Sequence, residues 1–208
     1  MLNLVLSIYM VMKKLSVRFI LLQILLVSLL FSSYNASAQK TTIWLVRHAE
    51  KADTPATNPP LTRLGQQRAK MLIKSLKGDR IAAVYITNFI RTTQTAKPIT
   101  DKYKLTPQIY DVNDYKGLAA KVLRQNKGKN VLIVGHSNTI VPTIVALGCE
   151  SPFPALNDDD YDILFKVTVK NGRADLEMSY YGSPHHSTVI PEKYDHQLSP
   201  VVHPVSNF

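Results

Sequence analysis

Three short apolar runs along the chain each end in a cluster of polar, chemically reactive residues. The runs are TIWLV at 42–46, IAAVYI at 81–86 and NVLIV at 130–134, and a segment with helical periodicity follows each of them. Short β-branched runs that alternate with helical segments are typical of a parallel sheet covered by helices on both faces. We therefore expect an α/β fold of three layers, α/β/α, around a mostly parallel central sheet.

The first predicted helix begins after Thr62, whose hydroxyl is a good N-cap. Gly65, Ala69, Leu72 and Leu76 share one face of this helix. The small residues Gly65 and Ala69 near its start predict close packing. The charged and amide side chains, Arg68 among them, are expected largely on the opposite, solvent-facing side.

The next helices also carry recognisable boundary signals. Asn88 is expected to cap the helix that contains Arg91, and Pro98 should kink or end that helix because proline lacks the amide hydrogen. Asp114 is expected to start a further helix that ends near Gly128.

Near the C-terminus the pattern changes from helical to alternating. The segments YDILFKVTV and ADLEMSYYG flank KNGR at 170–173, and the Asn-Gly pair favours a tight hairpin turn. This hairpin is predicted to add an antiparallel part to the sheet. The proline-containing segment ADTPATNPP at 52–60 is predicted to be a surface loop.

Residues 1–38 have the order of a secretory signal peptide. Lys13, Lys14 and Arg18 precede a long apolar run, and Ala36-Ser37-Ala38 follows as a small-residue cleavage site, with Met12 as an alternative start. We therefore expect a periplasmic or secreted protein with no stable membrane anchor after cleavage. Residues 39–182 are then the folded domain, and residues 183–208 form an irregular tail.

Composition limits the partners of this domain. The net charge is +10, and loss of the three basic residues of the leader lowers it to +7. A basic excess favours an anionic ligand or serves only solubility, and no basic stretch interleaved with aromatic residues indicates nucleic acid. Cys149 is the only cysteine, so no internal disulfide is expected, and a packing role is the simpler interpretation.

The tail contains four histidines, at positions 185, 186, 196 and 203. They have no firm metal-ligand spacing, so a loosely docked surface tail is the preferred interpretation. We expect neither a metal ion nor another cofactor.

Ligands of open α/β sheets bind at the carboxyl ends of the strands. There the three apolar runs would bring together Arg47, His48, Arg91 and His136. Guanidinium groups and helix N-termini suit a phosphoryl dianion. Neighbouring cations would keep the His48 imidazole neutral, with a lone pair available to attack phosphorus.

Four motifs, LVRHAEK, LTRLGQQRAKML, VYITNFIRTTQTAKPI and VLIVGHSNTI, resemble in sequence and order those of the histidine phosphatase superfamily, which has the phosphoglycerate mutase-like fold. The resemblance runs from about Thr41 to Gly182 and places the chain in the branch with an Arg-His-Ala/Gly motif. It implies that His48 is phosphorylated, and that Arg47, Arg91, His136 and Asn138 bind the substrate. The implied reaction is a metal-independent two-step hydrolysis of a small phosphorylated compound or a phosphorylated protein.

The resemblance leaves the proton donor open, because PQIYDVNDYKG lacks the glutamate-bearing motif of the mutases. Asp111, after a strand predicted at 109–110, is the first candidate. Asp114 is second because it is also a helix cap, and Glu50 is equally well explained by an ion pair with an arginine.

Other functional classes fit less well. Ser137 lies in VGHSNT, but a serine-hydrolase elbow needs a second glycine where Thr139 stands. A metal site of His48, Glu50 and His136 would suffer repulsion from the arginines. A phospholigand-binding protein without turnover stays open, and a phosphoglycerate-type mutase is disfavoured by the export signal.

Overall fold

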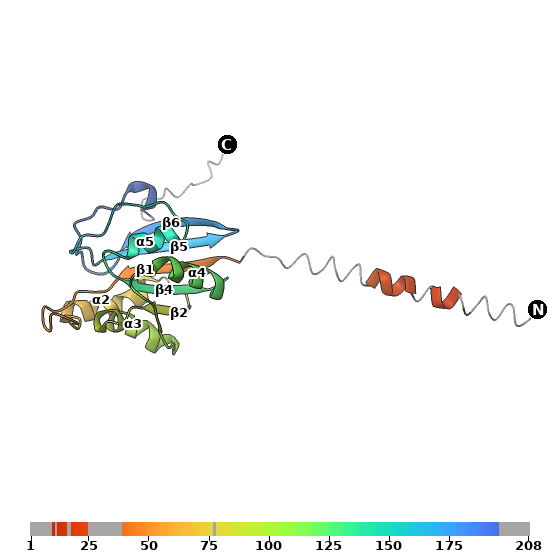
Figure 1. The fold of residues 1–208 in the computed structure, drawn as a ribbon, viewed down its shortest axis with the longest axis horizontal. Coiled ribbons are helices and arrows are strands. Elements are labelled where there is room, and N and C mark those ends of the chain that lie inside the picture. The colour runs from red at the N-terminus through yellow and green to blue at the C-terminus, as the bar shows by residue number, and fades with distance from the viewer. Residues whose placement is uncertain (1–9, 11, 16–17, 25–38, 77, 196–208) are drawn as a thin grey trace, which may run out of the picture. The chain divides into compact units, whose positions relative to one another are not determined.

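The computed structural model describes residues 10, 12–15, 18–24, 39–76 and 78–195 (Figure 1). The chain divides into two compact units, Met1–Gln39 and Lys40–Phe208. In the first unit the described residues 10, 12–15 and 18–24 are helical. Among the described residues, no helix combines the length and the apolar character needed to cross a membrane. The predicted cleavage site and His196 and His203 lie outside the described residues.

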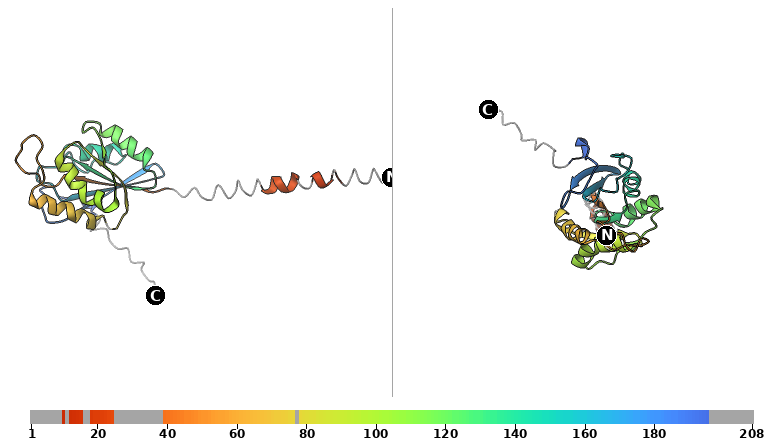
Figure 2. Two further views of the ribbon diagram at one scale, coloured as in Figure 1. Left: turned by 90° about the horizontal axis from the view of Figure 1, so that it is seen from below. Right: turned by 90° about the vertical axis from the view of Figure 1, so that its left-hand side faces the viewer.

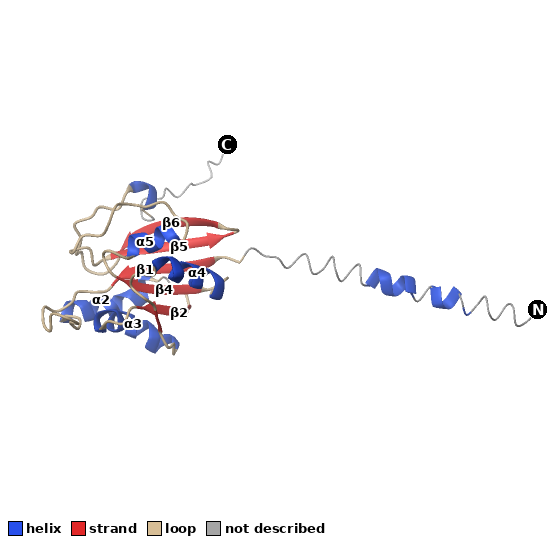
Figure 3. Ribbon diagram, viewed as in Figure 1, coloured by secondary structure: helices blue, strands red, loops and turns tan. Residues whose placement is uncertain are grey.

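Six strands of the second unit form one mixed sheet in the order β3-β2-β4-β1-β5-β6 (Figure 3). The parallel strands are β1 (Thr41–Arg47), β2 (Ile81–Ile86), β3 (Gln108–Ile109) and β4 (Asn130–Gly135). The three apolar runs of the sequence are thus β1, β2 and β4. Strands β5 (Ile163–Lys170) and β6 (Arg173–Tyr180) complete the sheet as an antiparallel hairpin that β5 joins to β1.

Alternation along the central strands divides the core into two layers. In β1, Ile43 and Leu45 pack with helices α4 (Tyr115–Gln125) and α5 (Ile140–Ala146), whereas Trp44 and Val46 pack on the other face. That second face is covered by α2 (Arg63–Ser75) and α3 (Ile90–Tyr103). Strands buried on both faces explain the continuous apolar runs. The predicted three-layer α/β/α fold is confirmed (Figures 1 and 2).

Helix α2 begins as predicted, because the Thr62 hydroxyl accepts a hydrogen bond from the Gly65 amide at 3.0 Å. A side chain at Gly65 would meet the Glu50 carbonyl oxygen 2.3 Å from its first carbon, so only glycine allows this close packing. The expected exposure of Arg68 is wrong. This residue is only 3% exposed because it forms a buried ion pair.

The expected cap of α3 is also wrong. Phe89 occupies the N-cap position without a side-chain hydrogen bond, and the Ile90 amide donates instead to Asn58 Oδ1 of the loop between β1 and α2. The helix continues past Pro98 to Tyr103, so proline does not end it. The cap of α4 is confirmed, since Asp114 accepts from the Gly117 amide at 2.8 Å.

The C-terminal hairpin turns at Asn171 and Gly172, both with positive φ angles of 53° and 75°, as the Asn-Gly signal predicts. After it, residues 183–195 are irregular but not loosely docked. The Ser187 and Thr188 amides donate to Asp160 Oδ1, and Ile190 is buried in the core. Buried carboxylates of the domain therefore fix the first half of the predicted tail. This segment contains one short 3-10 helix, η1 (Glu192–Tyr194).

Candidate active site

Three neighbouring strands deliver the predicted residues to one edge of the sheet. Arg47 ends β1 and His48 follows it, His136 follows β4, and the segment after β2 leads into the first turn of α3 with Arg91. The His48 amide donates to the Gly135 carbonyl at 2.9 Å, which joins the ends of β1 and β4. The predicted convergence of these four residues is therefore present in the structure.

The His48 imidazole is held in one orientation. It is 3% exposed, and Nδ1 lies 2.9 Å from the Ala49 carbonyl oxygen. Because a carbonyl can only accept, Nδ1 carries the proton and the lone pair is on Nε2. Burial lowers the pKa of His48 to about 3, assisted by the charge of Arg47 and despite the Ala49 hydrogen bond. The ring is therefore a neutral base at physiological pH.

His136 is oriented by a chain of hydroxyl groups. Its Nε2 lies 2.9 Å from Thr87 Oγ1, which lies 3.2 Å from Thr92 Oγ1. On the other side of the ring, Nδ1 lies 3.4 Å from an Arg91 nitrogen, which can only donate. Burial, followed by the charges of Arg91 and Arg47, lowers the pKa of His136 to about 4. A bound dianion would act in the opposite direction and favour its protonation.

Both arginines are held from one side and keep donors for a ligand. The Arg47 Nη1 donates to the carbonyls of Asn157 and Asp158 at 2.9 and 2.7 Å, and its guanidinium lies 4.1 Å from the Tyr161 ring centre. The Arg91 guanidinium lies 4.2 Å from the Phe89 ring centre. Both Nε–H groups are buried without a partner among the described residues. Buried donors in native proteins are almost always paired, so these two fit a site for an anionic acceptor.

The charge of this cluster is poorly balanced. Arg47 has one carboxylate nearby, Asp158 at 3.6 Å, whose side chain is 96% exposed. Among the described residues, no salt bridge includes Arg91, and both burial and the charge of Arg47 lower its pKa. Two guanidinium groups that repel each other favour binding of an anion between them.

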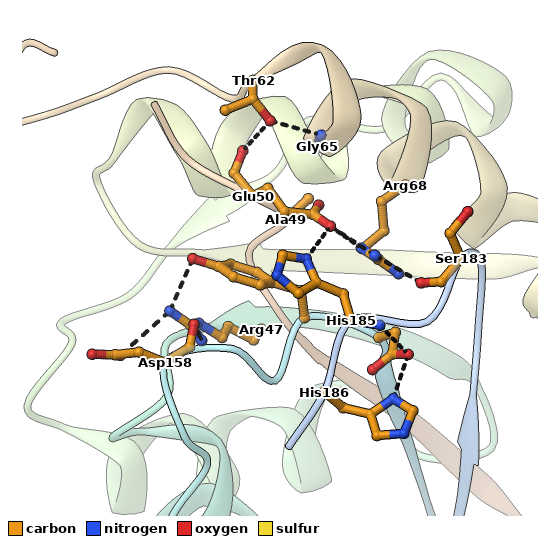
Figure 4. Close-up of polar contacts among 12 residues, drawn as sticks. Arg47, Ala49, Glu50, Thr62, Gly65, Arg68, Asp158, Ser183, His185 and His186 are labelled. Atoms are coloured by element: carbon orange, nitrogen blue, oxygen red, sulfur yellow. Dashed lines mark hydrogen bonds and ion pairs between the residues drawn. The ribbon is translucent and has the colours of Figure 1, made fainter. Parts of the chain in front are cut away.

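Glu50 takes no part in this cluster and instead forms a buried ion pair behind it. Its Oε1 accepts from Nε and Nη2 of Arg68 at 2.8 and 2.7 Å and lies 3.0 Å from Nδ1 of His185 (Figure 4). These bonds hold the pKa of Glu50 below its usual value although burial opposes them. The ion-pair interpretation of Glu50 is confirmed, with Arg68 as the arginine.

The remaining candidates, Asp111, Asp114 and Asn138, are exposed, unlike His48 and Arg47. Asp111 is exposed, and its carboxylate accepts from the Asn113 amide at 2.9 Å. Asp114 caps α4, and Asn138 is exposed on the turn before α5. Within the described ranges, no group of three His, Cys, Asp or Glu residues is arranged to hold a metal ion.

Ser137 does not have the backbone of a serine-hydrolase elbow. That elbow is a sharp, strained turn, whereas in the described chain positive φ angles at residues other than glycine occur only at Lys104 and Asn171. Cys149 is half-buried against the core, and burial raises its pKa to about 11, so it packs as predicted.

Sequence reasoning missed Tyr161, Phe89 and Thr87 as parts of the site. Thr87 and Phe89 precede Arg91 within the motif VYITNFIRTTQTAKPI, so their closeness to Arg91 in the sequence was a usable signal. Tyr161 lies in the acidic run NDDDYD, which has no periodicity and no feature that indicates contact with Arg47.

Acid should destabilise the fold in a way that depends on His48. Its folded pKa, about 3, lies below the value near 6.5 in an unfolded chain, so unfolding takes up a proton between these pH values. The free energy of unfolding should therefore decrease as the pH is lowered. Between pH 7 and pH 5, His48 alone should account for a loss of roughly 2 kcal/mol. Urea unfolding of wild type and His48→Asn at pH 7 and pH 5 measures this contribution.

The wild type should lose more stability than His48→Asn over this interval. Glu50 adds to the acid loss in both proteins, because its folded pKa is depressed and its stabilisation is lost as pH falls. Equal losses in the two proteins would contradict the buried, neutral state of His48.

Comparison with known proteins agrees with the geometry. Residues 43–112 match the model of the histidine phosphatase superfamily, branch 1. No curated protein matches the sequence significantly. Among solved structures, a candidate alpha-ribazole-5'-P phosphatase from Escherichia coli is similar, with 17% identity over 72% of this chain and 99% of that chain and a TM-score of 0.54.

Two further structures have the same fold at low identity. The protein histidine phosphatase SixA, complexed with tungstate, is 20% identical over 67% of this chain and 96% of its own, with a TM-score of 0.52. A mycobacterial glucosyl-3-phosphoglycerate phosphatase is 11% identical over 69% of this chain and 100% of its own, with a TM-score of 0.57. Residues 43–112 are thus similar to the histidine phosphatase superfamily, branch 1, and the solved structures share the fold of this chain.

Proposed function

We propose that this protein is a metal-independent phosphatase that hydrolyses phosphomonoesters, or phosphohistidine, through a covalent phosphohistidine on His48. The observation that carries the proposal is the neutral His48 ring, with its lone pair on Nε2, inside a cluster of two arginines and His136. Phosphoryl transfer requires chiefly positioning and charge stabilisation, which such a cluster supplies.

The reaction has two steps. The His48 Nε2 lone pair attacks phosphorus, the bond between phosphorus and the ester oxygen breaks, and the leaving alcohol takes up a proton. Water then attacks the phosphohistidine, the P–N bond breaks and inorganic phosphate leaves. Arg47, Arg91 and His136, whose protonation the charge of the bound dianion favours, would stabilise the phosphoryl oxygens in both steps.

The proton donor distinguishes this proposal from a binding protein without turnover. Asp111 stays our candidate for this role, although its exposed carboxylate accepts from the Asn113 amide. A substrate with a good leaving group, such as phosphohistidine, needs little help from a proton donor, so an exposed acid would be sufficient for it. An exposed acid equally suits a protein that binds phosphorylated ligands without hydrolysing them, and this is the second candidate function.

The substrate classes we propose are small phosphorylated compounds and phosphorylated proteins. The similar structures include phosphatases named for both classes. The secretory leader predicted at residues 1–38 would place the reaction in the periplasm or outside the cell, away from the substrates of glycolytic mutases.

A substrate panel tests the proposal. We expect the protein to release phosphate from phosphomonoesters or phosphohistidine, with activity retained after chelation and in Ser137→Ala. Carboxylic esters should not be hydrolysed. Tight phosphate binding without turnover on any phosphorylated member would favour the binding function instead.

A further inference from the structure

Tyr161 and His185 form a wall beside the phosphate-binding cluster. The Tyr161 ring covers the Arg47 guanidinium, and its centre lies 6.1 Å from that of His48. The His185 ring packs on Tyr161 with centres 4.9 Å apart. The two residues come from the segment before β5 and from the segment after β6, so this wall is built outside the region of the four motifs.

The structure fixes the position of His185 from several sides. Its amide donates to Asp162 Oδ2 at 2.9 Å, and its carbonyl accepts from the Tyr161 amide at 2.9 Å. Its Nδ1 lies 3.0 Å from Glu50 Oε1, and the carboxylate can only accept, so Nδ1 carries a proton (Figure 4). The nitrogen left for a ligand is Nε2, on a side chain that is 36% exposed.

We propose that Tyr161 and His185 contact the organic part of the substrate, and that His185 Nε2 hydrogen-bonds a hydroxyl or amino group on it. This inference deepens the proposed function and rests on it for the place of the phosphoryl group. The site would then select phosphomonoesters of polyols or other polar alcohols over those of apolar alcohols. A preorganised hydrogen-bonding group rejects an analogue that lacks the partner.

His186 provides a matched control. Its Nδ1 also meets a buried carboxylate, Asp162 Oδ2 at 2.7 Å, but its ring stacks on Tyr180 with centres 4.0 Å apart. It contributes to the anchoring of the same segment without packing on Tyr161. An effect specific to the wall should therefore appear at His185 and not at His186.

The experiment compares glycerol 3-phosphate with propyl phosphate in wild type, His185→Asn and His186→Asn. Asparagine can keep the hydrogen bond to Glu50 while it removes Nε2 and the ring. We expect wild type and His186→Asn to prefer glycerol 3-phosphate in kcat/KM, and His185→Asn to lose about tenfold of that preference, the effect of one hydrogen bond. A thermal melt of each variant checks that the fold is kept.

Binding of the same two compounds to His48→Ala, with and without His185→Asn, separates this inference from the proposed function. If the phosphate esters bind with a preference that depends on His185 but wild type hydrolyses neither, the phosphatase proposal fails. The proposed contact of Tyr161 and His185 with the organic part of the ligand is then still supported. If wild type shows no preference, or His185→Asn changes both compounds equally, the inference is overturned.

Discussion

Replacement of His48 by alanine is expected to lower the turnover number of the protein by on the order of 10⁴-fold or more, for every phosphorylated substrate that it hydrolyses. The His48 ring is the neutral nucleophile of the proposed reaction, because Nδ1 is committed to the Ala49 carbonyl and Nε2 has the lone pair. His136 cannot replace it, since its two nitrogens already face Thr87 and Arg91.

The control for this variant is Ser137→Ala, which leaves the whole cluster intact and should keep near wild-type turnover. Phosphate release is measured for both variants under saturating substrate, and a thermal melt excludes unfolding. Turnover of His48→Ala within tenfold of wild type would rule out His48 as the nucleophile.

The second large effect concerns stability. Arg68→Ala is expected to lower the free energy of unfolding by about 3–5 kcal/mol, because it removes one partner of a buried ion pair. Arg68 donates to Glu50 and also to the Tyr181 and Ser183 carbonyls at 2.9 Å each. Its loss leaves the Glu50 carboxylate with the His185 ring as its remaining side-chain hydrogen-bond partner. Urea unfolding measures the change.

Lys97→Ala is the matched control for an ion pair on a helix. Lys97 pairs with Asp101 at 3.0 Å, but both side chains are more than half exposed, so the expected loss is below about 1 kcal/mol. A loss of the same small size in Arg68→Ala would show that the buried pair contributes little. The double variant Arg68→Met with Glu50→Gln should recover part of the loss, since no buried charge then stays uncompensated.

The sheet could be predicted because its signals are local. The apolar runs that became β1, β2 and β4 are continuous where both faces are buried, and Asn171-Gly172 specifies its own turn. Arg68 could not be placed in the same way. Helical periodicity places it on the side of α2 that is expected to face solvent. Only its partners distant along the chain, Glu50 and the carbonyls of Tyr181 and Ser183, explain why a charge is buried there.

In the candidate site, too, some positions follow from local sequence signals and others depend on distant parts of the chain. Arg47, His48, Arg91 and His136 were predictable because the carboxyl ends of parallel strands meet at one edge of the sheet. Tyr161 and His185 were not, because their positions depend on irregular segments that the buried carboxylates of Asp160 and Asp162 hold together.

A rapid-quench experiment tests the central claim most directly. Wild type is mixed with a substrate that carries a radiolabelled phosphoryl group, the reaction is stopped within one turnover, and the labelled residue is mapped by peptide analysis. The account predicts an acid-labile, alkali-stable label on His48 that is absent from His48→Ala. Turnover without a labelled protein, or a label on another residue such as Ser137, would contradict it.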